Sequence, residues 1–270
     1  MQWHLPTADG AGELYVREIG SGETIIALHG GFARGQHTTL LPAVKHLADR
    51  FRLVLYDQRG TMRSPVPPEA YSLSGHIADL EQLRTELGLA RINLIGHSAG
   101  GNIAMAYLDR FPDRVGDLVL LSPSPPTTLP DTEAFQRFVH RPAVERELAA
   151  CGTAQDARTE SLRRRIRFAA ANCYHVERWR ELPADGVAGP PPRLTDAPEN
   201  WDYLAALARR TAPVPVILGD HDTVDLTGNR WPEAARLART VELHIISEAG
   251  HFSWIDQPAE FRRVLDRALD

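Results

Sequence analysis

The sequence of 270 residues has two cysteines, a single lysine and no long apolar run. Cys151 and Cys173 could pair, but in a chain without a leader sequence we expect two free thiols without a functional role. No apolar run approaches the roughly 20 residues of a membrane-spanning helix, and the N-terminus lacks the pattern of a signal peptide. We therefore expect a cytoplasmic protein with no membrane partner.

The chain also lacks a strong excess of charge. Its formal net charge is −5, from 30 basic and 35 acidic residues, and the two signs are interspersed. Because nucleic-acid binding needs a concentrated basic face, we expect no nucleic-acid partner. The hydrophobic content of 43% is ordinary, and the length allows one large α/β domain with an insertion.

The stretch that best indicates chemistry is residues 92–101, INLIGHSAGG. An apolar strand pattern runs into Gly-x-Ser-x-Gly around Ser98, and a helical pattern follows until Pro112. A sharp strand-to-helix turn pushes a serine hydroxyl into a site, and Gly96 and Gly100 suit such a turn because side chains there would collide. An ordinary Gly-Ser turn is the alternative. The flanking strand and helix favour a nucleophile.

Alternating strand and helix patterns predict an α/β fold, with a mostly parallel central sheet and helices on both faces. Residues 1–28 are expected to begin with antiparallel strands. The predicted strands cover residues 13–19, 24–28, 52–56, 92–95, 115–121, 214–218 and 241–246. The predicted helices cover 37–49, 74–87, 232–238 and 258–269, besides the one after Ser98. We expect Asp256 to cap the last helix, and Asp57 and Arg59 to brace neighbouring loops locally.

The alternation of strand and helix patterns stops after residue 122, and no strand pattern returns before residue 213. We therefore predict a core domain of residues 1–122 and 213–270 and a helical cap of residues 123–212. Helices are expected over 132–140, 142–150, 156–179 and 199–210. The Gly- and Pro-rich loop 182–198 is equally consistent with a lid and with disorder. The arginines at 163–165 and 167 are read as a solvated helix face rather than an anion site.

Two later strands end in loops that carry acids and histidines, on the same sheet edge as Ser98. His251 would take the proton of Ser98, and Asp222 would fix the imidazole tautomer. The N–H groups of Ala99 and Gly31 would form an oxyanion hole, with Phe32 as another donor from the loop 29–32. A plain Gly-Gly turn is the alternative for that loop.

Neighbouring residues complete the predicted site. We expect Phe32, His97 and Phe252 to contact the substrate, although His97 also suits a structural role. Asp220 and Asp225 could cap turns. A metal cluster of residues 220–222 is disfavoured because adjacent side chains cannot easily face one ion, so no metal or cofactor is expected.

At these residues the chain resembles the α/β-hydrolase superfamily, and within it the proline iminopeptidase branch of serine peptidases. The likeness covers residues 24–121 and 213–268. Its most specific motifs are His29-Gly30-Gly31, Tyr56-Asp57-Gln58-Arg59-Gly60, Gly96-His97-Ser98-Ala99-Gly100-Gly101, Gly219-Asp220-His221-Asp222 and Gly250-His251. The resemblance implies that the acid is Asp222 rather than Asp220.

The chain departs from that branch in three places. Phe32-Ala33 stands where Pro-Gly is usual, and Ala99 stands where the iminopeptidases have Trp. The cap motif of two tryptophans and a glutamate that holds the substrate's free amine is not recognisable. The acids of the predicted cap lie among arginines and suit ion pairs better than amine binding: Glu145, Glu147, Glu177 and Glu181.

We therefore expect a cofactor-free serine hydrolase that cleaves an ester or amide of a small-molecule substrate under the cap. A proline iminopeptidase-like aminopeptidase is the nearest alternative. From other classes, a ligand receptor on the same fold, or a lyase or cyclase with little hydrolytic turnover, stay open. The oligomeric state is not predicted.

Overall fold

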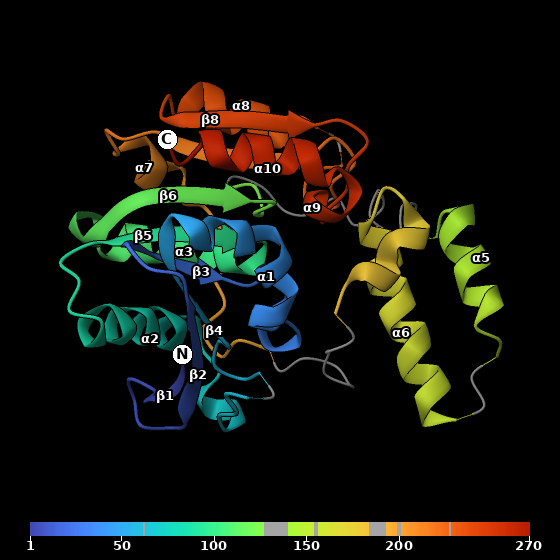
Figure 1. The fold of residues 1–270 in the computed structure, drawn as a ribbon, viewed down its shortest axis with the longest axis horizontal. Coiled ribbons are helices and arrows are strands. Elements are labelled where there is room, and N and C mark those ends of the chain that lie inside the picture. Colours follow the sequence, from blue (N-terminus) through green and yellow to red (C-terminus); the bar gives the residue numbers. More distant parts are fainter. Residues whose placement is uncertain (62, 127–139, 154–155, 184–192, 199–200, 227) are drawn as a thin grey trace.

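The computed structural model describes residues 1–61, 63–126, 140–153, 156–183, 193–198, 201–226 and 228–270 (Figure 1). Eight strands form one sheet in the order β1-β2-β4-β3-β5-β6-β7-β8. In chain order they are β1 (Gln2–Pro6), β2 (Glu13–Ile19), β3 (Glu23–Leu28), β4 (Phe51–Tyr56), β5 (Ile92–His97), β6 (Val115–Leu121), β7 (Val214–Gly219) and β8 (Val241–Ile246).

The helices alternate with these strands. Those of the sheet layers are α1 (His37–Val44), α2 (Leu73–Glu86), α3 (Ala99–Arg110), α7 (Leu204–Ala208), α8 (Arg230–Leu237), α9 (Ser253–Asp256) and α10 (Pro258–Arg267). Those between β6 and β7 that lie away from the sheet are α5 (Pro142–Ala150), α6 (Ala157–Asn172) and the 3₁₀ segment η5 (Val176–Glu181).

The sheet is mostly parallel, as predicted. β1 pairs antiparallel with β2, and β2 pairs antiparallel with β4, whereas every pair from β4 to β8 across the sheet is parallel. The carboxyl ends of β3, β5, β7 and β8 therefore meet at one edge. The loops that carry the predicted chemistry follow these ends.

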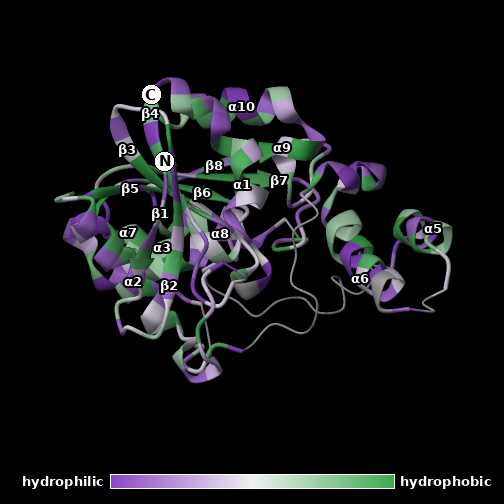
Figure 2. Cartoon of the chain, turned by 60° about the horizontal axis from the view of Figure 1, so that its bottom comes forward, coloured by the Kyte–Doolittle hydropathy of each residue, from purple (hydrophilic) through white to green (hydrophobic). Residues whose placement is uncertain are grey.

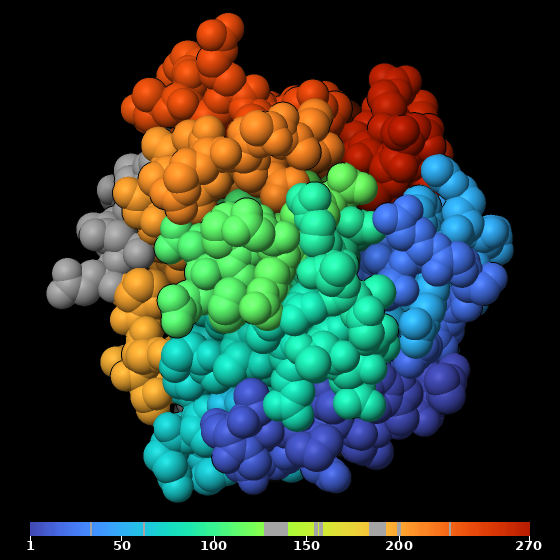
Figure 3. Space-filling model, turned by 90° about the vertical axis from the view of Figure 1, so that its left-hand side faces the viewer, coloured from blue at the N-terminus to red at the C-terminus, as the bar shows by residue number. Residues whose placement is uncertain are grey.

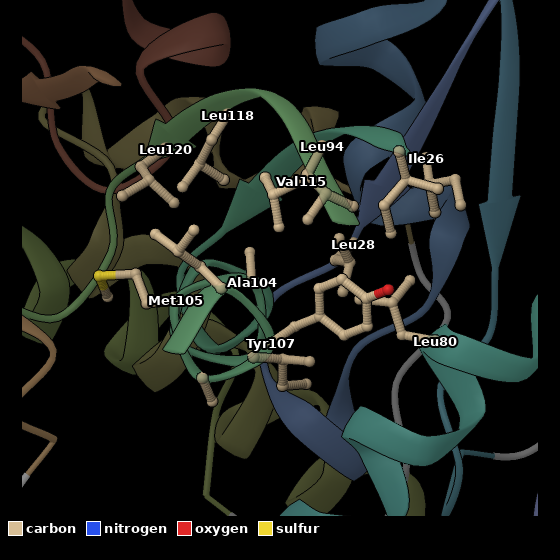
Figure 4. Packing of buried hydrophobic residues seen from close by; sticks show 14 of the residues in the cluster. Ile26, Leu28, Leu80, Leu94, Ala104, Met105, Tyr107, Val115, Leu118 and Leu120 are labelled. Carbon is tan, nitrogen blue, oxygen red and sulfur yellow. The ribbon is translucent and has the colours of Figure 1, made fainter. Parts of the chain in front are cut away.

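Two buried clusters fill the two faces of the sheet. One lies under α2, α3, α7 and α8, and Figure 4 shows its centre, where the Tyr107 ring of α3 lies between Leu28 and Leu80. The other lies under α1 and α10 and continues into α5 and α6. In Figure 2 the strands in the middle of the sheet are largely green and the outer helix faces largely purple, as expected of helices that bury one side. The helices on both faces were predicted.

α5 and α6 lie beyond the carboxyl ends of the strands, at the right of Figure 1. The opposite side, in Figure 3, is formed by N-terminal (blue), central (green) and C-terminal (orange and red) segments, and α5 and α6 are not visible there. The residues 123–212 that we predict as a cap contain no strand among those described.

The helices of this insertion differ from the prediction. The helix expected over 156–179 ends at Asn172, and η5 follows. The apolar spacing continues past that point, but the Asp256 carboxylate accepts hydrogen bonds from the amides of Tyr174 and His175, at 2.8 and 2.9 Å, and so takes them out of a helix. Asp256 is therefore not the cap of α10, whose N-cap, Gln257, has no side-chain cap bond.

The remaining predictions of the insertion have mixed outcomes. α5 matches the helix predicted over 142–150. Only a part of the helix predicted over 199–210 is seen as a helix among the described residues, namely α7, which packs on α3 and α8. The helix predicted over 132–140 lies outside the described residues except for its last position, and the central part of the loop 182–198 lies outside them as well.

Arg164 and Arg167 of α6 are exposed, as the predicted solvated face requires, whereas Arg163 and Arg165 are only partly exposed and also contact neighbouring segments of the insertion. Arg163 donates to the Leu148 and Gly152 carbonyls, and Arg164 pairs with Glu160. Arg165 lies over the ring of Trp179. Arg163 thus joins α6 to the end of α5, and Arg165 joins it to η5.

Asp57 and Arg59 contact the loop after β4, as the predicted local bracing implies, and also bind segments farther away in the sequence. Asp57 accepts from His37 Nδ1 at 2.7 Å, with both side chains fully buried. The buried Arg59 guanidinium donates two bonds of 2.7 Å to Asp79 on α2, and a third bond joins it to Asp9. Such bidentate pairing satisfies a buried charge that would otherwise be costly.

The structure bears on the absence of a membrane-spanning helix and on the state of the two cysteines. Among the described residues, no helix is both long and apolar enough to cross a membrane. Cys151 and Cys173 are unpaired. The cytoplasmic location stays a prediction.

Candidate active site

Ser98 occupies a strained turn between β5 and α3. Its backbone angles, φ 51° and ψ −120°, lie in a region that L-residues rarely adopt, at a cost of about 1–3 kcal/mol. The two flanking glycines explain how the chain fits. A Cβ on Gly96 would lie 2.7 Å from the Gly100 carbonyl oxygen, and one on Gly100 would lie 2.3 Å from the Leu28 carbonyl oxygen. The turn predicted from the sequence is therefore present.

His251 and Asp222 form a hydrogen-bonded pair at the same sheet edge. His251 Nδ1 lies 2.8 Å from Asp222 Oδ1, and the two side chains are 6% and 1% exposed. Because a carboxylate only accepts, Nδ1 carries a proton, and this leaves Nε2 as the nitrogen with the lone pair in the neutral ring, as a general base requires. The Val224 amide also donates to Asp222 Oδ1, which fixes the carboxylate.

His97 connects this pair to the Ser98 turn. Its ring centroid lies 4.8 Å from that of His251, and its Nε2 donates to the His251 carbonyl oxygen at 3.2 Å. Burial lowers the pKa of His97 well below its usual value, so the imidazole is neutral. His97 therefore joins the Ser98 turn to the backbone of the loop after β8 that carries His251 (the histidine loop).

The loop after β3 lies against the same turn. A Cβ on Gly30 would lie 2.8 Å from Ser98 Cβ, so only glycine allows this approach. His29 holds the loop in place: its Nδ1 donates to the Gly30 carbonyl at 2.8 Å, and its Nε2 accepts from the Gln58 amide at 3.1 Å. Burial lowers the pKa of His29 to about 4, consistent with this neutral tautomer.

Two backbone amides near Ser98 have no acceptor among the described residues. Ala99 is the first residue of α3, where amides lack an intrahelical partner, and Gly31 has a left-handed φ of 81°. Neither donates a hydrogen bond within the described part of the chain. The helix N-terminus also favours negative charge at this position.

The neighbouring acids are engaged differently from Asp222. Asp220 is exposed and accepts from His221 Nδ1 at 2.7 Å and from the Ala249 amide. Burial opposes ionisation of Asp220, but these bonds outweigh it and lower its pKa. Asp225 accepts from the Trp231 amide and caps α8, as one reading of the sequence suggested. Among the described residues no cluster of three His, Cys, Asp or Glu side chains could hold a metal ion.

A family model described as the alpha/beta hydrolase fold matches residues 23–258. The chain belongs to the α/β-hydrolase fold family. The predicted fold is thereby confirmed, and so is the coarse prediction of a hydrolase of this family.

Three individual similarities illustrate this membership. A proline iminopeptidase of Xylella fastidiosa is 35% identical over 118 residues, covering 42% of this chain and 36% of that protein, in line with the resemblance noted in the sequence. A Bacillus subtilis protein provisionally named 2-succinyl-6-hydroxy-2,4-cyclohexadiene-1-carboxylate synthase is 27% identical, covering 92% of this chain and 90% of its own. A thermophilic esterase from Thermogutta terrifontis has a TM-score of 0.71 at 24% identity, covering 100% of this chain and 98% of its own.

The three predicted substrate contacts of this α/β-hydrolase differ in exposure. His97 and Phe252 are each 2% exposed, and the Phe252 ring packs on His97 and His251. Phe32 is only partly buried, has a left-handed φ of 46°, and lies 5.9 Å from the ring of Trp201. Phe32 therefore has the most surface available to a ligand.

The acids of the insertion are mostly paired within it. Glu145 pairs with His140, and Glu181 pairs with Arg178. Glu147 accepts from Trp179 Nε1 and pairs with Arg180. Glu177 is 69% exposed, with His175 at 4.0 Å. The first three carboxylates thus have partners inside the insertion.

Several residues that support the site carry no sequence signal. Trp201 lies beside Phe32, and Asn172 and Thr223 connect the end of α6 to the loops that carry Asp222 and His251. Asp256 accepts from the Gly250 amide at 2.9 Å. Their partners are distant in sequence, so no local motif indicates them.

Burial of neutral histidines predicts that acid destabilises this hydrolase. The pKa of His29 is lowered to about 4, that of His76 to about 3, and that of His97 also well below normal, all by burial. Between about pH 6.5 and 4 the unfolded chain therefore binds more protons than the folded one, and the free energy of unfolding falls as the pH falls. Each histidine contributes up to about 1.4 kcal/mol per pH unit.

Urea unfolding at pH 7, 6 and 5 measures this slope. His76→Asn should reduce the slope by about one proton, and His4→Asn, whose side chain is exposed on β1, serves as the control for a histidine that folding does not bury. Equal unfolding free energies at pH 6 and pH 5 would contradict the assignment.

Proposed function

We propose that the protein is a serine hydrolase that cleaves an ester or amide bond of a small-molecule substrate through an acyl-enzyme. The observation that carries this proposal is the position of Ser98 on a strained turn at the sheet edge where His251 is hydrogen-bonded to Asp222. A serine hydroxyl needs a base to become nucleophilic. We propose His251 Nε2 as that base. The substrate is proposed to lie under the cap of residues 123–212.

In the proposed reaction, His251 Nε2 takes the Ser98 Oγ proton as Oγ attacks the substrate carbonyl carbon. The Asp222 carboxylate stabilises the resulting imidazolium. His251 then protonates the leaving alcohol or amine as its bond to carbon breaks. A water molecule, deprotonated by His251, attacks the acyl-enzyme and releases the acid and free Ser98.

The negative charge that develops on the carbonyl oxygen needs donors fixed in advance. We propose the amides of Ala99 and Gly31 for this role, since neither donates within the described residues. Ala99 follows Ser98 directly, and Gly31 follows Gly30, where a Cβ would lie 2.8 Å from Ser98 Cβ. Such a donor is typically worth about 3–4 kcal/mol of transition-state stabilisation. His29 would act indirectly, by holding the loop of Gly31.

A fluorophosphonate probe tests the nucleophile. We expect stoichiometric labelling of Ser98 in the wild-type protein and none in Ser98→Ala. Ser98→Ala and His251→Ala should each lower kcat for p-nitrophenyl esters by more than about 10³-fold, and the double variant should lose little more, because the two residues act as a unit. Full turnover by a folded Ser98→Ala variant would contradict the acyl-enzyme.

The two neighbouring aspartates provide a matched pair for testing the acid. Asp222→Asn should lower kcat on the order of 10⁴-fold, because an amide favours the wrong imidazole tautomer. Asp220→Asn, whose carboxylate binds His221 instead, should lower kcat far less. Steady-state kinetics of both variants decides, and a larger loss in Asp220→Asn would move the acid to that position.

A lyase or synthase is the second candidate, because one relative that covers 92% of this chain carries a synthase name. In that case the pocket would work without an acyl-enzyme. Wild-type protein that turns over no ester or amide and is not labelled at Ser98 by the fluorophosphonate would favour this candidate.

The paired carboxylates of the insertion predict a preference for neutral substrates. An aminopeptidase must pair the substrate's ammonium group with a carboxylate, since burying that charge unpaired costs several kcal/mol. Glu147 and Glu181 already pair with arginines, and Glu145 already accepts from His140. A neutral p-nitrophenyl or anilide substrate should therefore have a higher kcat/KM than a prolyl or alanyl arylamide with the same leaving group.

Relative kcat/KM at one pH checks this preference. A more than tenfold preference for the free-amine substrates, about 1.4 kcal/mol of transition-state binding, would overturn it. Glu177→Gln would then be the first variant to make, with Glu181→Gln as its control.

A further inference from the structure

The carboxyl end of α6 lies on both loops that carry the His251–Asp222 pair. The His251 amide donates to the Asn172 carbonyl oxygen at 2.8 Å, and Thr223 Oγ1 donates to Asn172 Oδ1 at 2.6 Å. Thr223 follows Asp222 directly in the sequence. One residue of the helical insertion thus accepts a hydrogen bond from each of the two loops.

The orientation of the Asn172 side chain is fixed by its partners. Its Nδ2 donates to the Phe168 carbonyl oxygen at 2.7 Å, and a carbonyl can only accept. Oδ1 must therefore face Thr223 and accept from its hydroxyl. Asn172 is 4% exposed, so water does not compete strongly for these bonds.

The backbone approach at this point leaves little freedom. A Cβ on Gly250 would lie 2.5 Å from the Asn172 carbonyl oxygen, so this loop position requires glycine. The Asp256 carboxylate also accepts from the amides of Gly250, Tyr174 and His175. The end of α6 and the histidine loop are therefore held together at several points.

We infer that Asn172 and Thr223 are positioning residues. They hold the loop that carries Asp222 (the acid loop) and the loop that carries His251 (the histidine loop) in the relative position that brings His251 Nδ1 to Asp222 Oδ1. This inference rests on the proposed function. The Thr223–Asn172 bond restrains the residue next to Asp222, while the backbone of Asn172 restrains His251 itself. Loss of the bond allows the acid loop to shift, and a shift of about 1 Å in a catalytic group can cost about 10²-fold in rate.

Thr223→Val tests the inference, because valine has nearly the shape of threonine without the hydroxyl. We expect kcat for a p-nitrophenyl ester to fall about tenfold or more with KM unchanged. Thr223→Ser, which keeps the donor, should restore most of the rate. Asn172→Ala should lower kcat similarly. The double variant should lose no more than the worse single variant, because both changes remove the same Thr223–Asn172 bond.

Thr240→Val is the matched control. Thr240 Oγ1 donates to the Leu207 carbonyl at 2.8 Å just before β8, at the opposite end of the strand from His251. It should lower the urea midpoint without changing kcat. Unchanged kcat in both folded Thr223→Val and folded Asn172→Ala, or equal losses in Thr223→Ser and Thr223→Val, would overturn the inference.

Labelling separates this inference from the proposed function. A wild-type protein that fluorophosphonate does not label at Ser98 would refute the hydrolase mechanism itself. Normal labelling and turnover of the wild type, with variants of equal rate, would refute only the positioning role.

Discussion

The close approach of three backbone segments at Ser98 is the constraint on which the site depends. The end of β5, the start of α3 and the loop after β3 come so near that side chains on Gly96, Gly100 or Gly30 would overlap neighbouring atoms. The left-handed φ of Ser98 is part of the same geometry. Its strain of about 1–3 kcal/mol persists because β5 and α3 are anchored in the fully buried core on either side.

Buried neutral imidazoles connect the loops around this turn. His29 joins the loop after β3 to the loop after β4, and His97 joins the turn to the backbone of His251. Each ring uses N–H as a donor, and that of His29 also accepts through its other nitrogen. Desolvation keeps such rings uncharged, so their hydrogen bonds position the loops without placing a second positive charge beside the proposed base.

The helical insertion is more than a cover for the strand ends. Several of its acids and arginines pair with one another, and its polar attachments to the core include the end of α6, bonded to Thr223 and Asp256, and Asp196, which accepts from the amides of Leu73 and Ser74. Aromatic side chains from separate segments, such as Phe32 with Trp201 and Phe168 with Phe252, lie near the same edge. Phe168 is 50% exposed, so an apolar surface is available there without moving the attached end of α6.

The sequence by itself determined the strands, the layered fold, the turn at Ser98 and the family, because these depend on local periodicity and on motifs of adjacent residues. It also indicated Asp222 and His251 through the order of the strand-end loops. It was wrong where a distant group competes for the backbone: Asp256 accepts the amides of Tyr174 and His175 and ends a helix that the apolar spacing would continue. Only the tertiary structure decided the partners of Arg59, the tautomer of His29 and the contacts of Asn172, because each depends on groups 20 or more residues away that the packing of the sheet brings together.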